Sequence, residues 1–338
     1  MPDYVRLKDI AAKAGVSVAT VSMALRGSEL LPESTRQRIA VLAEKMGYRS
    51  HPYVSAYMSW RRTRGGLKRP TIALLHAYPG EDGWRKHESP TLREMHRGAM
   101  EQARTRGYAT EQFRLGSARP SRLVDILRAR GIKGLVFAPV PQVVADYGFP
   151  LTDFSAVQIG VGPMALNLPR VAHDHYRGAL EAVRQCGAQG YRRPGLIIDP
   201  EHDLRLQHVW RAGFEMGAAE KRFPRTAIFP LSEMRPDRST LACWLKQWRP
   251  DVIVTNLHRL VEKMLAELDY AVPADVGLVS LSVPAPQHRV SGINQNGFLI
   301  GSTAVDLLAS ALQLHQTGEA TDAIATLIGG RWNPGETF

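Results

Sequence analysis

The segment from Leu7 to Gly27, LKDIAAKAGVSVATVSMALRG, constrains the fold of this chain more than any other. Its apolar residues repeat at helical spacing on both sides of Gly15, and glycine readily adopts the positive φ that a sharp turn between two helices requires. Ser17 stands where the second helix needs an N-cap, because a serine oxygen accepts a hydrogen bond from a free backbone amide of the first turn. The pattern predicts a helix-turn-helix.

The outward face of this second helix carries small apolar residues, hydroxyl groups and one flanking arginine, but no acid. Its members are Val18, Ala19, Ser22, Met23 and Arg26. In a helix-turn-helix this face enters the major groove of DNA, where its first residues meet the base edges. The alternative is an ordinary two-helix hairpin with a solvated polar face. A solvated face seldom combines such residues with so few acids.

Three further segments precede a change in composition. Pro32 is well placed to begin a third helix, since proline suits the first helical turn, and an apolar stripe then runs from Ile39 to Met46. Residues 48–60 have helical spacing but are too few for a stable isolated helix. Residues 61–69, RRTRGGLKR, are typical of a flexible basic linker. We therefore expect a three-helix headpiece followed by a segment that folds only against DNA and a second subunit.

The positive charge of the chain is concentrated at its N-terminal end. Residues 1–69 hold 13 Lys and Arg against 5 Asp and Glu, a net charge of +8, whereas the formal charge of all 338 residues is +11. This asymmetry is typical of a protein that binds a polyanion. No basic segment followed by an apolar run opens the sequence, and no apolar run of about 18 residues occurs. We expect a cytoplasmic protein that does not enter a membrane.

The headpiece carries a more specific signal. The segments LKDIAAKAGVSVATVSMAL and PESTRQRIAVLAEKMGYR resemble the headpiece of the LacI/GalR family of bacterial transcription regulators, and the resemblance covers almost the whole chain. It implies a second helix that reads the major groove of duplex DNA and a hinge helix that enters the minor groove. It also implies a periplasmic-binding-protein-like body that senses a small molecule and forms a homodimer on a pseudo-palindromic operator.

The resemblance also assigns DNA contacts. Relatives usually push a leucine between base pairs, nine residues after the tyrosine that matches Tyr48; here that count reaches Tyr57, with Met58 beside it, and either could act as the wedge. Many relatives have a polar residue at Met23, whereas methionine favours apolar contact, for example with thymine methyl groups. The expected DNA-binding residues are Leu7, Ser17, Val18, Ala19, Thr20, Ser22, Met23, Arg26, Tyr48, Tyr57 and Met58.

From Thr71 onward the pattern changes to alternating strands and helices, which is typical of α/β folds. In a first series, strands are expected at 71–78, 109–115 and 134–140, and helices at 91–107 and 121–131. A second series has helices at 176–186, 202–217, 239–248 and 257–268, and strands at 195–198, 226–231, 251–256 and 276–282. One more helix at 301–314 and one more strand at 325–332 follow.

These patterns and the resemblance predict an all-α helix-turn-helix headpiece followed by an α/β periplasmic-binding-protein-like body of two doubly wound parallel-sheet lobes. The expected domains are the headpiece at 1–50, the hinge helix and basic linker at 51–69, and the body at 70–338. Within the body we expect an N-lobe at about 70–170 plus 297–325 and a C-lobe at about 171–296 plus 326–338. The effector would bind in the cleft between these lobes.

The cleft is where this sequence departs from its relatives. The arginine with which relatives bind the effector falls at Trp210, and their usual aspartate falls at Ser282. Arg211 could reach in from the next position, and Trp210 could instead be an aromatic residue of the core. We expect either a ligand with a flat face on Trp210, carbohydrate included, or a pocket that has lost small-molecule sensing. The expected effector-binding residues are His76, Asp174, Trp210, Arg211, Asn256 and Ser282.

The sequence gives little support for a bound nucleotide, a metal ion or a catalytic nucleophile. The sequence contains no phosphate-binding glycine loop, no dinucleotide fingerprint and no nucleophile elbow. The run His173, Asp174, His175 is a weak metal pattern because the histidines lack a helical partner at i+4. We expect no cofactor, no metal and two free buried thiols, at Cys186 and Cys243.

The sequence therefore predicts an effector-responsive transcription regulator, a repressor, and no enzyme. The first alternative is an α/β enzyme with an appended DNA-binding module, which a nucleophile and a base in the cleft would support. A solute-binding protein is a third interpretation. It would explain the body but would leave the headpiece unexplained and would need a signal peptide.

Overall fold

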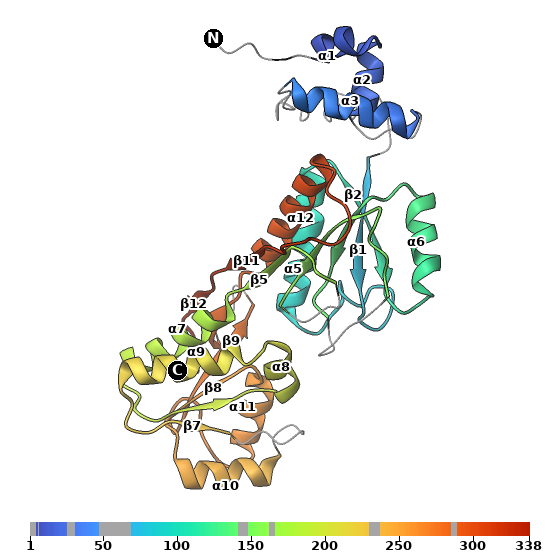
Figure 1. The fold of residues 1–338 in the computed structure, drawn as a ribbon. Helices are drawn as coiled ribbons and strands as arrows, with labels where there is room; N and C mark the ends of the chain where they lie inside the picture. Colours follow the sequence, from blue (N-terminus) through green and yellow to red (C-terminus); the bar gives the residue numbers. More distant parts are fainter. Residues whose placement is uncertain are drawn as a thin grey trace. The chain divides into compact units, whose positions relative to one another are not determined.

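The computed structural model describes residue 5 and residues 7–25, 31–46, 69–140, 148–161, 166–229, 237–284 and 289–338. The chain divides into two compact units, Met1–Arg69 and Pro70–Phe338. Each unit, drawn as a ribbon in Figure 1, has a hydrophobic core of its own. In the described ranges, every helix is too short or too polar to cross a lipid bilayer.

The first unit is the headpiece. It consists of α1 (Leu7–Ala14), α2 (Val18–Ala24) and α3 (Glu33–Lys45), and each helix contributes one fully buried residue, Ile10, Val21 and Ile39 respectively. Gly15 has a φ of +67° in the turn between α1 and α2, a conformation that side chains disfavour. The predicted helix-turn-helix is therefore present.

The second unit is the body, and it contains two lobes, each built on a six-stranded sheet. The first sheet is parallel throughout, with the strand order β11-β5-β4-β3-β1-β2. Its strands are β1 (Thr71–His76), β2 (Ala109–Arg114), β3 (Gly134–Phe137), β4 (Ser155–Ile159), β5 (Arg170–His173) and β11 (Ala325–Ile328). One face packs against α5 (Pro90–Thr105) and α12 (Gly297–Gln313), and the other against α6 (Pro120–Ala129).

The second sheet has the order β12-β10-β9-β8-β6-β7, and only its edge strand β12 is antiparallel. Its strands are β6 (Pro194–Ile197), β7 (Ala227–Ile228), β8 (Val252–Thr255), β9 (Gly277–Val283), β10 (Ser291–Asn294) and β12 (Arg331–Asn333). One face packs against α7 (His175–Ala188) and α9 (Val209–Lys221). The other packs against α10 (Arg238–Trp248) and α11 (His258–Ala266). The predicted pair of doubly wound lobes is therefore correct.

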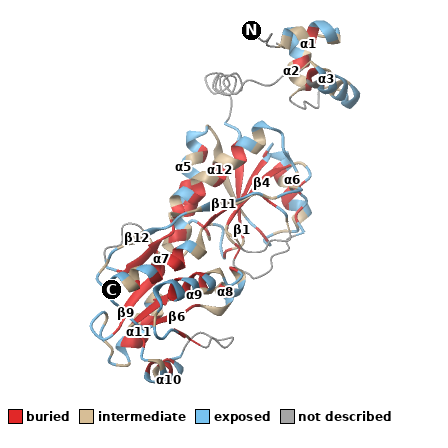
Figure 2. Cartoon of the chain, turned by 60° about the vertical axis from the view of Figure 1, so that its left-hand side comes forward, coloured by how far each residue is buried: buried red, intermediate tan, exposed pale blue. Residues whose placement is uncertain are grey.

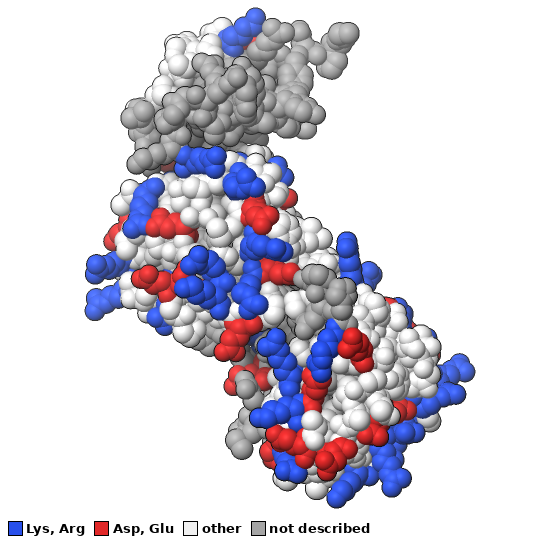
Figure 3. Space-filling model, turned by 180° about the vertical axis from the view of Figure 1, so that it is seen from behind, with Lys and Arg blue, Asp and Glu red and all other residues white. Residues whose placement is uncertain are grey.

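Burial follows this layered arrangement. The central strands of both sheets are buried on both faces, whereas the helices expose their outer sides (Figure 2). Parallel strands covered on both faces need near-continuous apolar sequence, and β1 (TIALLH) and β8 (VIVT) have it. The surface of the body carries Lys and Arg interspersed with Asp and Glu (Figure 3).

Several elements differ from the expected ones. The helix expected at 202–217 is two helices, α8 (Pro200–Arg205) and α9, because Gln207 and His208 both take a positive φ. The strand expected at 325–332 is also two, since Gly329 and Gly330 let the chain pass from β11 in the first sheet to β12 in the second. Strands β4, β5 and β10 were not anticipated.

The borders between the lobes also lie slightly later than expected. The first sheet ends at residues 173 and 328, whereas the expected borders of the N-lobe are at about 170 and 325. The described chain then crosses between the lobes at Asp174, at Gln295 and Asn296, and at the glycine pair after β11. These crossings are hydrogen-bonded to one another. The Asp174 amide donates to the carbonyl of Ile328 at 2.9 Å, and the Asn296 side chain donates to that of Gly329 at 2.6 Å.

Candidate DNA interface and interlobe site

The start of α2 is shaped by its N-cap. Ser17 has extended backbone angles, φ −68° and ψ 154°, and its Oγ accepts a hydrogen bond from the Thr20 amide at 3.0 Å. The hydroxyl groups of the same two residues lie 2.9 Å apart. The cap fixes the direction in which the first turn of α2 leaves the turn at Gly15.

The residues at this helix start are the exposed ones. Ser17, Val18 and Ala19 are exposed, and Val18 keeps 46% of its surface in solvent. Thr20, Ser22, Met23 and Leu7 are half-buried. Helix α2, VATVSMA, contains no charged residue, so an exposed valine and alanine lie on a face without acids. The predicted contacts of Arg26, Tyr48, Tyr57 and Met58 lie outside the described residues.

The two lobes of the body meet through polar contacts, and we call this region the interlobe junction. At the start of α5, the Thr91 hydroxyl lies 3.1 Å from that of Ser282 on β9. From the end of α8, Arg205 donates through Nη1 to the carbonyl of Val140, the third residue after β3, at 2.7 Å. Beside it, the Tyr78 hydroxyl donates to the Pro139 carbonyl at 2.6 Å.

Trp210 lies next to this junction, in the core of the second lobe. Only 3% of it is exposed. The His202 ring stacks on it with centroids 5.9 Å apart and planes 18° apart, and the His175 ring meets it edge-on at 5.1 Å. A flat ligand could therefore lie on the face that His202 covers only if His202 moved.

The histidines of this region are neutral. Burial lowers the pKa of His202 and that of His173 to about 4, and it lowers the pKa of His175 well below its ordinary value. Arg205 donates a second hydrogen bond through Nη2 to Nε2 of His202, which must then carry a lone pair. This contact is consistent with an uncharged imidazole.

The remaining predicted effector residues have intramolecular partners. His76 donates from Nε2 to the Glu81 carbonyl at 2.9 Å, and burial lowers its pKa. Asp174 caps α7 by accepting from the Arg177 amide at 3.0 Å. The Asn256 side chain accepts from the Asp199 amide at 2.9 Å, which holds the start of α8. Arg211 lies 3.9 Å from the buried Asp203.

Sequence reasoning missed three residues of the junction, namely Arg205, Tyr78 and Thr91. Each has a polar group that reaches the other lobe or lies beside such a contact. The break between α8 and α9 aims Arg205 at Val140, and no glycine or proline marks that break. Because apolar residues keep helical spacing through 202–217, the sequence pattern gives no sign of this break.

A nucleophile and a base do meet in the second lobe. Ser280 Oγ lies 3.0 Å from Nδ1 of His258, and burial lowers the pKa of that histidine. Ser280 is fully buried, however, and its Oγ also donates to the Ser282 carbonyl at 3.1 Å. A hydroxyl without solvent access cannot attack a substrate, so this pair does not support the enzyme alternative.

Metal and thiol chemistry find little support in the described ranges. No group of three or more His, Cys, Asp or Glu side chains there could hold a metal ion. Cys186 is a buried free thiol as expected, and burial raises its pKa. The expectation for Cys243 was wrong, because this free thiol is exposed on the outer side of α10.

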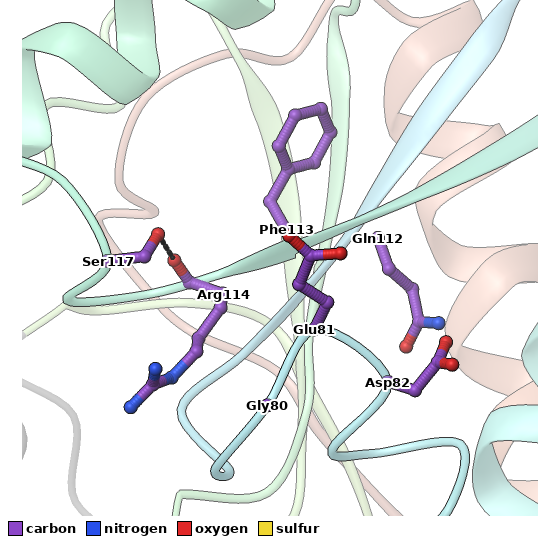
Figure 4. Close-up of a pocket in the computed structure, with 7 residues that line it drawn as sticks. All are labelled: Gly80, Glu81, Asp82, Gln112, Phe113, Arg114 and Ser117. Carbon is purple, nitrogen blue, oxygen red and sulfur yellow. Dashed lines mark hydrogen bonds between the residues drawn. The ribbon is translucent and has the colours of Figure 1, made fainter.

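A hollow of about 540 Å³ opens elsewhere on the first lobe (Figure 4). The loop after β1 lines it with Gly80, Glu81 and Asp82, and the edge strand β2 lines it with Gln112, Phe113 and Arg114, with Ser117 beyond. None of the predicted effector residues belongs to this lining. The Asp82 carboxylate is already paired with Arg85 at 2.6 Å and Lys86 at 3.2 Å.

Comparison with known proteins supports this architecture. Residues 6–51 match the family model described as bacterial regulatory proteins, lacI family, and residues 183–338 match that of a periplasmic binding protein-like domain. The transcriptional repressor CytR of Escherichia coli is 25% identical over 218 residues, which are 62% of this chain and 57% of CytR. Catabolite control protein A of Streptococcus mutans is 32% identical over 230 residues, 66% of this chain and 63% of that protein. The chain thus spans less than two thirds of these curated relatives.

Solved structures extend the similarity of fold to nearly the whole chain. The lac repressor dimer, bound to operator and the anti-inducer ONPF, matches with a TM-score of 0.57 at 16% identity, over 99% of both chains. The transcriptional regulator CelR, in complex with cellobiose, matches with a TM-score of 0.55 at 16% identity, over 99% of this chain and 100% of that one. The chain therefore carries the helix-turn-helix domain of the lacI family of bacterial regulatory proteins, joined to a periplasmic binding protein-like domain.

Proposed function

We propose that this protein is a transcriptional repressor that binds a pseudo-palindromic DNA operator as a homodimer. A small molecule bound between the lobes of the body would control its affinity for the operator. The observation that carries this proposal is the Ser17-capped start of α2, which exposes Val18 and Ala19 on a helix without acids. Val18, which is 46% exposed, and the exposed Ala19 give this helix start an apolar surface that suits contact with base edges.

Relatives support both halves of the proposal. CytR is named a transcriptional repressor, and the lac repressor structure contains the operator and the anti-inducer ONPF. The net charge of +8 on residues 1–69 would supply the sequence-independent part of DNA affinity. Since its target would be chromosomal DNA, we propose that the protein acts in the cytoplasm.

The proposed DNA contacts divide by position. Val18, Ala19 and Met23 would meet base edges, whereas other headpiece residues would lie nearer phosphates. That second group is Thr20, Ser22, Arg26 and Tyr48, with Leu7 and Ser17 at the margins. Tyr57 or Met58 would unstack a central base step from the minor groove.

The proposed effector site lies at the interlobe junction. The sequence assigns His76, Asp174, Trp210, Arg211, Asn256 and Ser282 to it. Of these, Ser282 contacts the other lobe through Thr91, and Asn256 holds the start of α8. A ligand between the lobes would therefore act on contacts that join them.

Selection of bound sequences from random duplex DNA tests the proposal. We expect wild-type protein to enrich a two-fold symmetric site. Met23→Arg should change the base preferred at one step of each half-site, because a bidentate arginine–guanine contact discriminates by about 1–3 kcal/mol. Ala12→Ser, on the exposed side of α1, is the matched control and should leave the preference unchanged. A failure of wild-type protein to enrich any sequence would contradict the proposed function.

The hinge assignment has a separate test. Tyr57→Ala or Met58→Ala should reduce DNA bending in a circular-permutation assay, since an inserted side chain kinks the duplex. Effector binding should stay intact. Unchanged bending in both variants would show that neither residue is the wedge.

A further inference from the structure

Arg205 is a cation that lies between the lobes without an anion beside it. Within the described residues, no carboxylate lies within ion-pair distance of its guanidinium group. Its acceptors are both neutral, namely the Val140 carbonyl and Nε2 of His202. Burial lowers the pKa of Arg205, although an arginine remains charged in proteins.

The acids closest to Arg205 do not neutralise it by contact. Asp199 and Glu201 raise its pKa, but by less than burial lowers it. The Asp199 carboxylate caps α8, where it accepts from the His202 amide at 3.0 Å. Glu201 is exposed. Tyr78 also faces Arg205, and its hydroxyl donates to the Pro139 carbonyl.

The neighbours of Arg205 include further polar atoms that lack partners. The indole Nε1 of Trp210 and Nδ1 of His175 are buried, and neither has a hydrogen-bond partner among the described residues. Both rings belong to the same group as His202, since His175 and His202 contact Trp210. A buried donor without a partner is costly, by about 1–3 kcal/mol.

These features describe a site that would recognise negative charge. A guanidinium group binds a phosphate or a carboxylate through two parallel hydrogen bonds, which are roughly twice as strong as bonds to neutral acceptors. Burial disfavours the charged form of the surrounding histidines, so Arg205 supplies the positive charge, and Nε1 of Trp210 is a hydrogen-bond donor without a partner in the same group of side chains. Such a ligand would replace the Val140 carbonyl and the His202 imidazole on Arg205.

We propose that Arg205 anchors an anionic effector, a small molecule that carries a phosphate or carboxylate group, at the interlobe junction. This assignment rests on the proposed function and names the chemical class of its effector. Because Arg205 bonds to the first lobe from the second, a ligand that occupied its guanidinium group would break the Val140 contact. The ligand would thereby act directly on the connection between the lobes.

Isothermal titration of the full-length protein, without DNA and at constant ionic strength, tests the proposal. The probes are inorganic phosphate, glucose 6-phosphate, gluconate and neutral glucose. We expect phosphate-bearing or carboxylate-bearing probes to bind wild-type protein, and Arg205→Met to weaken that binding about 10- to 100-fold. Arg205→Lys should lie between the two, because lysine keeps the charge but loses the planar fork.

Arg184→Met is the matched control, because Arg184 pairs with Glu220 at 2.9 Å on the surface of the same lobe. It should bind the probes as wild-type protein does. Anions that attach to the basic headpiece would bind all variants alike. The result is therefore the difference in probe affinity between the Arg205 variants and the wild-type protein. Circular dichroism spectra verify that each variant is folded. If Arg205→Met does not fold, the weaker anion binding expected of Arg205→Lys decides the test.

The outcomes separate this inference from the proposed function. Equal binding of anions by wild type and Arg205→Met, or no binding of any anionic probe by wild type, overturns the role of Arg205 even if operator binding is intact. Glucose 6-phosphate against gluconate tells which anion is preferred. A bound anion that leaves operator affinity unchanged overturns its role as an effector, because coupling between two sites is reciprocal.

Discussion

The hydroxyl groups of Thr91 and Ser282 lie 3.1 Å apart and join the start of α5 in the first lobe to the end of β9 in the second. The two residues are 191 positions apart in the sequence. Thr91 is only 5% exposed, so loss of its partner would leave a polar group with little access to water. This pair and the Arg205–Val140 pair are polar contacts through which one lobe constrains the other.

A double-mutant cycle on this pair should reveal an interaction between the lobes. Thr91→Val and Ser282→Ala should each lower the free energy of unfolding, and the double variant should lose less than the sum, by about 0.5–1.5 kcal/mol. Thr105→Val is the control, since the Thr105 hydroxyl donates to the Glu101 carbonyl of its own helix and, among the described residues, joins no second element. Urea denaturation measures the difference, and additive losses would mean that the hydroxyls do not stabilise one another.

Ser17→Ala should destabilise the headpiece by about 1 kcal/mol, because the Thr20 amide would lose its capping acceptor. Ser17→Thr keeps an oxygen at that place and should lose much less. The two variants carry the same charge, so they do not differ in their electrostatic attraction to DNA. A loss of operator affinity in Ser17→Ala alone would therefore indicate that the first turn of α2 has become less ordered. Thermal unfolding followed by circular dichroism measures the stability of each. Equal stability of Ser17→Ala and wild type would contradict the capping role.

Trp210→Ala should cost about 3–5 kcal/mol of the free energy of unfolding, since it leaves a cavity among His175, His202 and the core of the second lobe. Trp210→Phe should cost less. Trp248→Ala is the comparison, because Trp248 is half-buried with the Arg225 guanidinium over its ring at 4.8 Å. If chemical denaturation gave no larger loss at Trp210 than at Trp248, the tight packing around Trp210 would be refuted.

Stability should fall as the solution is acidified through the range in which buried histidines resist protonation. The pKa of His173 is about 4 in the folded protein, against 6.5 ordinarily, so below pH 6.5 the unfolded chain binds a proton that the folded chain does not. The contribution of His173 is therefore fully present above pH 6.5 and is lost towards pH 4. The difference between a pKa of 6.5 and one of about 4 corresponds to about 3 kcal/mol of the free energy of unfolding.

His173→Asn should flatten this pH dependence because asparagine does not titrate in this range. Its amide can still donate to the Ile328 carbonyl, to which the histidine ring donates at 3.1 Å. Gln313→Asn, which replaces one exposed amide with another and does not titrate, should keep the slope. Denaturant unfolding at a series of pH values gives both slopes. An unchanged slope in His173→Asn would remove this residue as a source of the acid sensitivity.

The sequence predicted most of the fold because its local signals agree with the tertiary structure. The apolar face of the headpiece helices recurs in the buried Ile10, Val21 and Ile39, and the runs TIALLH and VIVT are buried strands. Local spacing could not predict β4 and β10. Gln158 is a buried polar residue inside β4, and Gly292 weakens the strand pattern of β10.

The interlobe site was harder to predict because distant contacts create it. The break after α8 depends on Asp203, whose carboxylate accepts from Nδ1 of His208 at 2.8 Å and whose carbonyl accepts from the His208 amide. No glycine or proline marks this place in the sequence. Arg205 gains its role only through that break. The resemblance to relatives therefore assigned Trp210 to the site, whereas the helical spacing of residues 202–217 gave no sign of a role for Arg205.

The crossings between the lobes act as a mechanical element. The chain passes from one sheet to the other beside β5, β10 and β11, and the passages are tied together by the hydrogen bonds from Asp174 and Asn296. Several tethers that lie side by side can all bend about one common axis, whereas a twist would stretch some of them and compress others. We therefore expect opening and closing of the lobes to be the soft movement of this body, and a twist of one lobe against the other to be the stiff one. A ligand that alters the Arg205 contact would spend its binding energy on that single movement, which is what a switch requires.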